Sequence, residues 1–372
     1  MKPEAPKLLS EAQEFPPMRI KGVGYDVGAY MLFNWRPDFD IATVRRELEI
    51  IKSDLHCNTV RIGAQDIRRV TAASQAALEQ GLDVWFSPIL WDKSPQDTLE
   101  YIKRGAAAAE QLRTQFPDRL VFCLGGELTL FMKGIVEGAR LWNRLSSPKL
   151  VPMLKTGAHN KPLNDFLAKA NSAARSVFHG QVTYASLVWE KVDWSLFDYV
   201  GVDHYRATKI EDKYIEMLKP LFSFGKPVVN TEFGYATTRG GKLETGFLSS
   251  AGLGGQEIVD TKSQLFHYKI PILGRFIKLR VNGEHTRDEG WQASKLVETL
   301  QILDAAGVYG TFVSQFVSQV NPYSDNPRYD LDVASTGLVK YFEDGRRGTT
   351  YPDMRWEPKE SFRAVADYYS KH

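Results

Sequence analysis

The sequence predicts a (β/α)₈ (TIM) barrel, an α/β fold in which eight parallel strands alternate with helices. Short apolar runs alternate with longer amphipathic segments, as in a parallel sheet that is buried on both faces. Eight such runs occur, and polar residues follow several of them, at the strand end where a barrel carries its active site. With 372 residues, 43% of them hydrophobic, the chain is expected to form one domain over residues 1–372.

Each strand is predicted from an apolar run and each helix from apolar residues at helical spacing. Helices are expected over residues 41–55, 98–116 and 291–306, and a single turn over 192–196 is the short link between the fifth and sixth strands. The predicted strands are residues 20–28, 57–64, 81–90, 119–128, 181–189, 197–205, 226–235 and 309–319.

A doubly wound parallel sheet is the competing fold. It requires a glycine-rich phosphate loop after its first strand. The segment GVGYDVG (22–28) is rich in glycine, but Tyr25 and Asp26 interrupt it and no GxGxxG follows. Eight runs with polar ends therefore favour the barrel.

Residues 236–289 interrupt the alternation and are predicted to be a long insertion after strand seven. A loop of this length in a compact domain is usually functional or mobile. Because it leaves the strand just after Glu232, we expect it to lie near the barrel mouth as a lid; a surface excursion is the alternative.

Composition excludes several classes of protein. The formal net charge of +2 argues against a nucleic-acid or anionic-membrane partner, and no apolar run approaches the roughly 18 residues of a membrane span. The N-terminus lacks the pattern of a secretory signal, so a cytoplasmic location is expected. Cys57 and Cys123 are interpreted as buried free thiols, and without a CxxC pair no metal site or cofactor is predicted.

Two glutamates stand out among the residues at the predicted strand ends. Glu127 follows VFCLGG and Glu232 follows VVNT, and a carboxylate at such a place is costly unless it is paired. Arg61, after NTV, is the natural partner. The full set of strand-end candidates is Asp26, Arg61, Trp91, Glu127, Trp189, His204, Tyr205, Glu232 and Gln315, with Tyr235 as the last residue of the seventh predicted strand.

Two carboxylates can cleave a glycosidic bond when their environments push their pKa values apart. Arg61 and Tyr205 are expected to keep Glu232 ionised, as the nucleophile. The apolar neighbours of Glu127 in the sequence are expected to keep it protonated, as the acid. The alternative is that both glutamates are structural, salt-bridged carboxylates.

This arrangement resembles the glycoside hydrolases of clan A, which are (β/α)₈ barrels. The resemblance implies an acid/base glutamate at the end of strand four, matched by Glu127 in LGGEL, and a nucleophile glutamate at the end of strand seven, matched by Glu232 in NTEFG. It also implies an arginine ending strand two, Arg61 in NTVRI, and a tyrosine that contacts the nucleophile, Tyr205 in FDYVGVDHY. It extends over about residues 20–341 and implies a small-molecule or oligosaccharide substrate.

Two positions depart from the clan pattern. Gly126 stands where clan members usually carry the asparagine that binds the sugar 2-hydroxyl, and Gln315 and Phe316 stand where they carry a tryptophan. A second hypothesis is therefore a glycosidase-derived barrel that binds a non-sugar, biosynthetic ligand or performs acid–base chemistry on it. The segment 328–342 also resembles proteins labelled abortive infection protein, which suggests a phage-defence interaction protein as a third hypothesis.

The other candidates have structural alternatives. His204 is interpreted as a hydrogen-bonded pocket histidine rather than a metal ligand, and Asp26 as a substrate contact or as the cap of the next turn. The aromatic candidates Trp35, Trp91, Trp189 and Tyr235 favour packing, with one or two of them expected to stack on substrate. Glu190 is interpreted as a solvated loop charge. The DLD motif at 330–332 is considered as a cation site, but its flanks lack further ligands.

Overall fold

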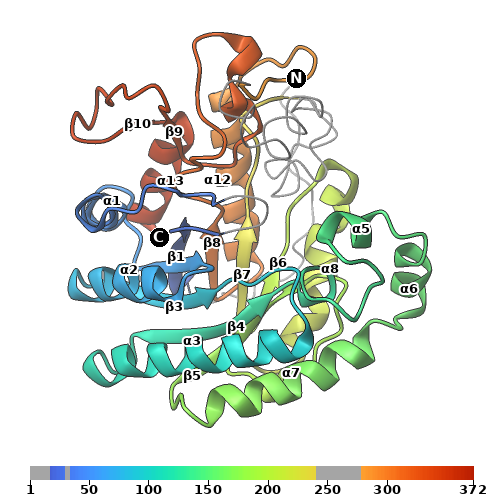
Figure 1. Cartoon of the computed structure of the whole chain (residues 1–372). Helices are drawn as coiled ribbons and strands as arrows, with labels where there is room; N and C mark the ends of the chain where they lie inside the picture. Colours follow the sequence, from blue (N-terminus) through green and yellow to red (C-terminus); the bar gives the residue numbers. More distant parts are fainter. Residues whose placement is uncertain (1–16, 30–33, 240–277) are drawn as a thin grey trace.

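The predicted barrel is confirmed. A computed structural model describes residues 17–29, 34–239 and 278–372, and in it eight parallel strands pair in chain order and close into a barrel (Figure 1). Parallel pairing of β1 with β8 closes the ring, with Gly22 opposite Phe312. The strands are β1 (Ile20–Asp26), β2 (Thr59–Ala64), β3 (Asp83–Pro88), β4 (Leu120–Gly126), β5 (Gln181–Leu187), β6 (Val200–Asp203), β7 (Val228–Phe233) and β8 (Gly310–Val313).

Helices follow most strands and form the outer layer. They include the three that the sequence predicts, α1 (Ile41–Ser53), α3 (Pro95–Gln115) and α12 (Glu289–Ala305). Between β5 and β6 lies only a 3₁₀ turn, η1 (Trp194–Leu196), which is the short link that the sequence indicates. The other elements up to β8 are α2 (Ile67–Glu79), α4 (Leu128–Phe131), α5 (Leu141–Leu145), α6 (Leu150–Thr156), α7 (Asn160–Arg175), η2 (Thr208–Lys213) and α8 (Tyr214–Phe222).

Element boundaries differ from the prediction in a regular way. The strands are shorter than the apolar runs, because each run continues into the loop at the barrel mouth; the run 309–319 contains a strand of four residues. Helix α3 begins earlier than predicted, since Ser94 caps it by accepting a hydrogen bond from the Asp97 N–H and a proline follows at the first helical position.

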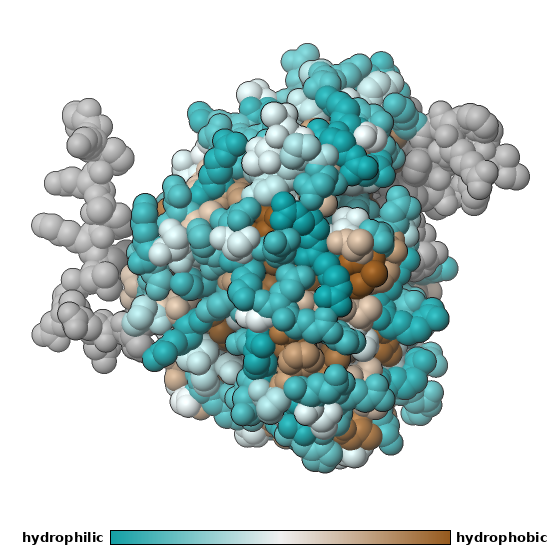
Figure 2. All heavy atoms as spheres, turned by 90° about the vertical axis from the view of Figure 1, so that its left-hand side faces the viewer, coloured by the Kyte–Doolittle hydropathy of each residue, from teal (hydrophilic) through white to brown (hydrophobic). Residues whose placement is uncertain are grey.

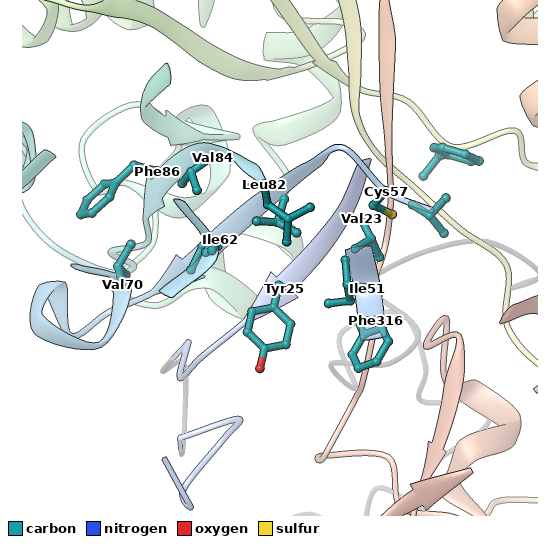
Figure 3. Close-up of a cluster of buried hydrophobic side chains, with 14 of the residues drawn as sticks. Val23, Tyr25, Ile51, Cys57, Ile62, Val70, Leu82, Val84, Phe86 and Phe316 are labelled. Atoms are coloured by element: carbon teal, nitrogen blue, oxygen red, sulfur yellow. The ribbon is translucent and has the colours of Figure 1, made fainter. Parts of the chain in front are cut away.

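Two apolar layers hold the barrel together. Side chains that point outward from the strands pack against the helices, and Figure 3 shows this layer around β1, β2 and β3. Side chains that point inward fill the floor of the barrel, where Trp85 and Phe312 meet with ring centroids 5.0 Å apart. The other members of this floor cluster are Ile20, Val121 and Val229. The filled floor leaves open only the end of the barrel at which the strands finish.

The chain after β8 closes over the seam between the first and last strands. It forms the 3₁₀ turns η4 (Pro327–Tyr329) and η5 (Leu331–Ala334), the antiparallel pair β9 (Val339–Tyr341) and β10 (Trp356–Pro358), and helix α13 (Glu360–Lys371). The hydroxyl of Tyr369 on α13 donates to the carbonyl of Gly22 on β1, 3.0 Å away. The C-terminal helix therefore secures the strand pair that closes the barrel.

A buried ion network anchors the end of the insertion. Arg287 pairs with Asp330 at 3.1 Å and with Asp332 at 2.8 Å, and Lys359, which is fully buried, pairs with Asp332 at 2.8 Å. Both aspartates of the DLD motif thus form ion pairs with Arg287 or Lys359, which argues against the metal-cation site considered for this motif. Most of the predicted lid, residues 240–277, lies outside the described residues, so its position over the mouth stays a prediction.

Within the part of the chain that the structure describes, no helix is both long enough and apolar enough to cross a bilayer. One face of the molecule, shown in Figure 2, is mostly hydrophilic, with small separate apolar areas. Cys57 and Cys123 are buried free thiols, as the sequence predicts.

The close approach of β1 to β8 predicts that Gly22→Ala destabilises the protein. A Cβ atom at residue 22 would lie 2.5 Å from the Phe312 ring and 2.8 Å from the backbone oxygen of Thr311, so the seam must open. Overpacking of this kind costs about 1–3 kcal/mol. Chemical denaturation measures the loss. Gly24→Ala on the same strand is the matched control, because its nearest contact would be an ordinary 3.6 Å; equal stability of the two variants would contradict the prediction.

Candidate active site

A cavity of about 120 Å³ lies at the open end of the barrel, among residues at the ends of β1, β2, β3, β4, β6, β7 and β8. Both glutamates that the sequence singles out line it. The other polar lining residues include Asp26, Arg61, Ser87, Asp203, Thr231, Ser314 and Gln315. Ala29, Trp35, Ile89, Leu90, Trp91, Leu128 and Phe131 are among the apolar ones. The lining therefore combines polar and apolar side chains.

Glu232, the penultimate residue of β7, is held by the two partners that the sequence proposes. The Tyr205 hydroxyl donates to its Oε1 at 2.5 Å, and Arg61 Nη1 lies 3.4 Å from its Oε2. Burial, together with the nearby charge of Asp203, raises the pKa of Glu232 to about 7, while Arg61 and the hydrogen bond from Tyr205 lower it. The two contacts stabilise the ionised form, which predominates above neutral pH.

Asp203 belongs to the same cluster, although the sequence analysis did not select it. Arg61 Nη1 lies 3.3 Å from Asp203 Oδ1 and donates to the carbonyl of Thr231 at 2.8 Å; the Thr231 hydroxyl donates to Asp203 Oδ1 at 2.6 Å. Burial raises the pKa of Asp203, and Arg61 opposes that rise. Arg61 is thus shared between two carboxylates, and its position is fixed by a backbone carbonyl.

Glu127 lies just after β4 in a different environment. Burial raises the pKa of its carboxyl well above the usual range, the charges of Asp203, Glu232 and Glu190 raise it further, and the charge of Arg61 lowers it. No salt bridge joins Glu127 to any described residue. The neutral, protonated form is therefore favoured, in contrast to Glu232.

The backbone of Glu127 is unusual. Its φ of 51° and ψ of 36° are left-handed, which is uncommon for a residue other than glycine and costs free energy.

Glu190, interpreted from the sequence as a solvated loop charge, is only 4% exposed and hydrogen-bonds to the turn that follows Glu127. That interpretation is wrong, because the short loop after β5 folds Glu190 back under the turn.

Three other candidates also line the cavity: Asp26, Trp91 and Gln315. Asp26 caps the turn after β1, since its carboxylate accepts the N–H of Gly28 at 2.9 Å and that of Ala29 at 3.2 Å. It also lines the cavity, and its contact to substrate stays a prediction. Burial raises its pKa to about 6, against those hydrogen bonds.

An aromatic wall forms beside Asp26 and Glu127. The Trp91 ring lies 5.3 Å from that of Trp35 and 5.1 Å from that of Phe131, measured between centroids. Trp35, one of the four aromatic residues considered in the sequence, also lines the cavity.

Four candidates are not among the residues that line the cavity. Tyr205 reaches the site through its hydrogen bond to Glu232, whereas the other three make contacts elsewhere. His204 is 1% exposed and stacks on Tyr214 of α8, because its side chain leaves the strand on the face opposite to Asp203. Burial lowers its pKa to about 4. The Tyr235 hydroxyl bonds to Thr299 of α12 at 2.7 Å, and the Trp189 ring packs edge-on against His159. His204 and Tyr235 serve as contacts to the outer helices, and Trp189 as a contact to the residue that precedes α7.

Gly126 leaves space beside the arginine. A Cβ atom at this position would lie 3.4 Å from Arg61 Nη2 and 3.3 Å from the Ala185 side chain. Nη2 makes no hydrogen bond to any residue that the structure describes, whereas Nη1 makes three. Arg61 therefore has donor capacity left next to Glu127, at the place where the clan pattern has an asparagine.

The chemistry available here is that of paired carboxylates. No group of three or more histidine, cysteine, aspartate or glutamate side chains in the described ranges is arranged to hold a metal ion. One carboxyl group favours its proton and another favours its charge, within a single cavity with an apolar wall. Such a site can donate a proton on one side of a bond and a nucleophile or base on the other.

Known structures share this fold. No protein-family model and no curated protein sequence matches the chain. A GH113 β-1,4-mannanase is similar with a TM-score of 0.56 and 12% identity, over 95% of this chain and 100% of that one. Ruminococcus gnavus β-glucuronidase is similar with a TM-score of 0.52 and 13% identity, over 95% of this chain but 50% of its own. Bacteroides uniformis β-glucuronidase 2 gives a TM-score of 0.50 and 15% identity, over 95% of this chain and 35% of its own.

The chain thus spans half or less of these two glucuronidases. At these identities the comparisons establish a shared glycoside hydrolase-like barrel fold and leave the reaction to be argued from the site. They give no support to the resemblance to proteins labelled abortive infection protein.

Proposed function

We propose that the protein is a retaining glycoside hydrolase, with Glu232 as nucleophile and Glu127 as acid/base. The observation that carries the proposal is the asymmetry between the two glutamates. Glu232 receives a hydroxyl hydrogen bond and an arginine contact, whereas Glu127 has burial and three neighbouring carboxylates that favour its proton. Two carboxyl groups with opposed preferences are what acid-assisted cleavage of a glycosidic bond requires.

The proposed reaction has two steps. Glu127 gives its proton to the glycosidic oxygen while a Glu232 oxygen attacks the anomeric carbon, so that the bond to the leaving group breaks and a glycosyl ester forms. Glu127, now ionised, takes a proton from water, whose oxygen attacks the anomeric carbon and displaces Glu232. Both glutamates return to their starting states. Arg61 and Tyr205 stabilise the charge on Glu232 before the first step and as it returns after the second.

The cavity suits a sugar ring. A cavity of about 150 Å³ can hold a benzene-sized ring, so about 120 Å³ matches one small ring with its remaining parts toward the opening. A sugar has an apolar face and a rim of hydroxyls. The aromatic wall of Trp35, Trp91 and Phe131 fits the former, and Asp26, Gln315 and Arg61 Nη2 fit the latter.

A second candidate function is acid–base chemistry on a non-sugar ligand in a barrel derived from a glycosidase. The glycine at residue 126 and the apolar wall favour it, since both reduce the number of groups that read sugar hydroxyls. A screen of aryl glycosides of pentoses and hexoses with the wild-type protein separates the candidates. Release of the phenol supports hydrolysis, and no release from any of them favours the second candidate.

Glu232→Gln is expected to abolish turnover. The amide cannot form the ester, and it removes the charge that Arg61 and Tyr205 stabilise. Loss of a nucleophile lowers kcat by about 10⁴-fold or more. Steady-state kinetics measures this, and circular dichroism checks the fold. The control is Glu216→Gln at an exposed position on α8, which should keep wild-type activity. Near-wild-type turnover by Glu232→Gln would falsify the assignment.

Glu127→Gln is expected to slow cleavage according to the leaving group. Unactivated substrates should lose about 10²–10⁴-fold, the usual contribution of a general acid. Activated aryl glycosides need no proton, so they should still form the glycosyl-enzyme, which intact-mass spectrometry detects and which then persists. Azide, an anion that needs no general base, should restore turnover. If azide has no effect and no covalent adduct accumulates, the retaining mechanism is excluded.

Tyr205→Phe is expected to move the acidic limb of the pH–activity profile to higher pH. In the wild-type protein the hydrogen bond from Tyr205 lowers the pKa of Glu232. Without that bond the pKa rises, so a higher pH is needed to ionise the nucleophile. The profile of kcat/KM against pH measures the shift. Tyr199→Phe at the other end of β6, where the hydroxyl bonds to Gln181, is the matched control and should leave the limb in place. A shift to lower pH would contradict the assignment of Glu232.

A further inference from the structure

We propose that Glu190 is a positioning residue for Glu127: together with Tyr184 it binds the backbone N–H groups that follow Glu127 and so leaves the Glu127 carboxyl free to face the cavity. The inference rests on the role proposed for Glu127 in hydrolysis. Neither the clan resemblance nor the fold comparisons assign a role to Glu190.

The local geometry creates a need for such a residue. Glu127 occupies the N-cap position of α4, whose first N–H groups have no partner within the helix. An N-cap side chain commonly accepts one of these N–H groups itself. Glu127 makes no such bond, and a carboxyl group that did so would turn back over its own helix. Other groups must therefore satisfy the turn.

Strand β5 and the residues after it supply those groups. The Glu127 N–H donates to the carbonyl of Ala185 at 2.9 Å, and the Leu128 N–H donates to the Tyr184 hydroxyl at 2.7 Å. The Thr129 N–H donates to Glu190 Oε1 at 3.2 Å. Three consecutive N–H groups are thus bound by β5 and the loop that follows it, which holds Glu127 in its left-handed conformation.

Glu190 is itself fixed from two sides. The Tyr184 hydroxyl donates to Glu190 Oε2 at 3.0 Å, and the Leu187 N–H donates to the same oxygen at 2.9 Å. Its carboxylate accepts all three hydrogen bonds while it is almost fully buried. Each of these bonds joins Glu190 either to the turn that follows Glu127 or to the strand beside that turn. Glu190 is therefore placed to set the position of the candidate catalytic acid.

Glu190 also contributes charge. The ionisable groups around Glu127 include Asp203, Glu232, Glu190, the Tyr184 hydroxyl and the cation Arg61. Burial raises the pKa of Glu190 to about 7, so above neutral pH it is mainly ionised. Its charge then raises the pKa of Glu127 and extends the pH range over which the acid keeps its proton. Removing that charge should therefore shift the basic limb of the activity profile to lower pH.

Glu190→Gln is the test variant, because it keeps the size of the side chain and removes the charge. The expected result is a fall of roughly 10- to 100-fold in kcat with KM little changed, as for a misplaced catalytic group. The basic limb of kcat/KM should move to lower pH. A residue with a purely structural role lowers stability without moving that limb, so an unshifted limb overturns the proposal.

Two further variants cover the remaining outcomes. Tyr184→Phe removes the hydroxyl that binds Leu128 but keeps the charge of Glu190, so kcat should fall while the basic limb does not move down. If Glu190→Gln does not fold, this variant decides, and unchanged kcat overturns the proposal. Glu110→Gln is the matched control: Glu110 pairs with Arg113 and His179 on the outside of the barrel, and its loss should lower stability alone.

An activity-independent measurement separates this proposal from the proposed function. Infrared difference spectra across a pH titration report the carboxyl C=O band of protonated Glu127, which its absence in Glu127→Gln identifies. In Glu190→Gln that band should disappear at lower pH than in the wild type. If the wild type cleaves no glycoside, hydrolysis is excluded, but the band shift still supports the positioning role; an unshifted band rejects it.

Discussion

The site depends on the sharing of one buried cation among several carboxylates. Glu127, Asp203 and Glu232 line the same cavity, and Arg61 is the only lysine or arginine among its described lining residues. A buried carboxylate without a partner is strongly disfavoured, so the three cannot all be ionised cheaply. Arg61 Nη1 lies near Asp203 and Glu232, and this leaves Glu127 to keep its proton. The proposed division of roles between the glutamates follows from where that one guanidinium is held.

The features that follow from the repeated pattern of apolar runs with polar ends could be predicted from the sequence. Apolar runs predicted all eight strands, and the rule that polar strand ends share one face predicted that Glu127, Glu232, Arg61 and Tyr205 meet. Asp203 could also have been found. Because side chains alternate along a strand, a residue two before the inward-facing Tyr205 faces inward too, and the same rule turns His204 outward.

What the sequence could not predict are features set by contacts between distant segments. Nothing near Glu190 indicates that it folds back under the turn after Glu127, since its partners lie on β5 and at residue 129, 61 positions away. The pairing of Asp332 with Arg287 and Lys359 likewise converted an apparent cation motif into an internal network. Tertiary packing decides such cases, and it is not encoded in local pattern.

The left-handed backbone at Glu127 connects these levels. A strained residue persists only where its surroundings hold it, and here β5 and the loop after it bind three successive N–H groups, beginning with that of Glu127. Burial and the charges of Asp203 and Glu232 favour protonation of Glu127, and Glu190, in the loop after β5, adds to them. The position of the candidate acid therefore depends on β5 and the loop after it, whereas the contacts of the candidate nucleophile come from β2 and from the segment that follows β6. Separate supports for the two carboxyl groups are what allow one cavity to hold them in opposite states.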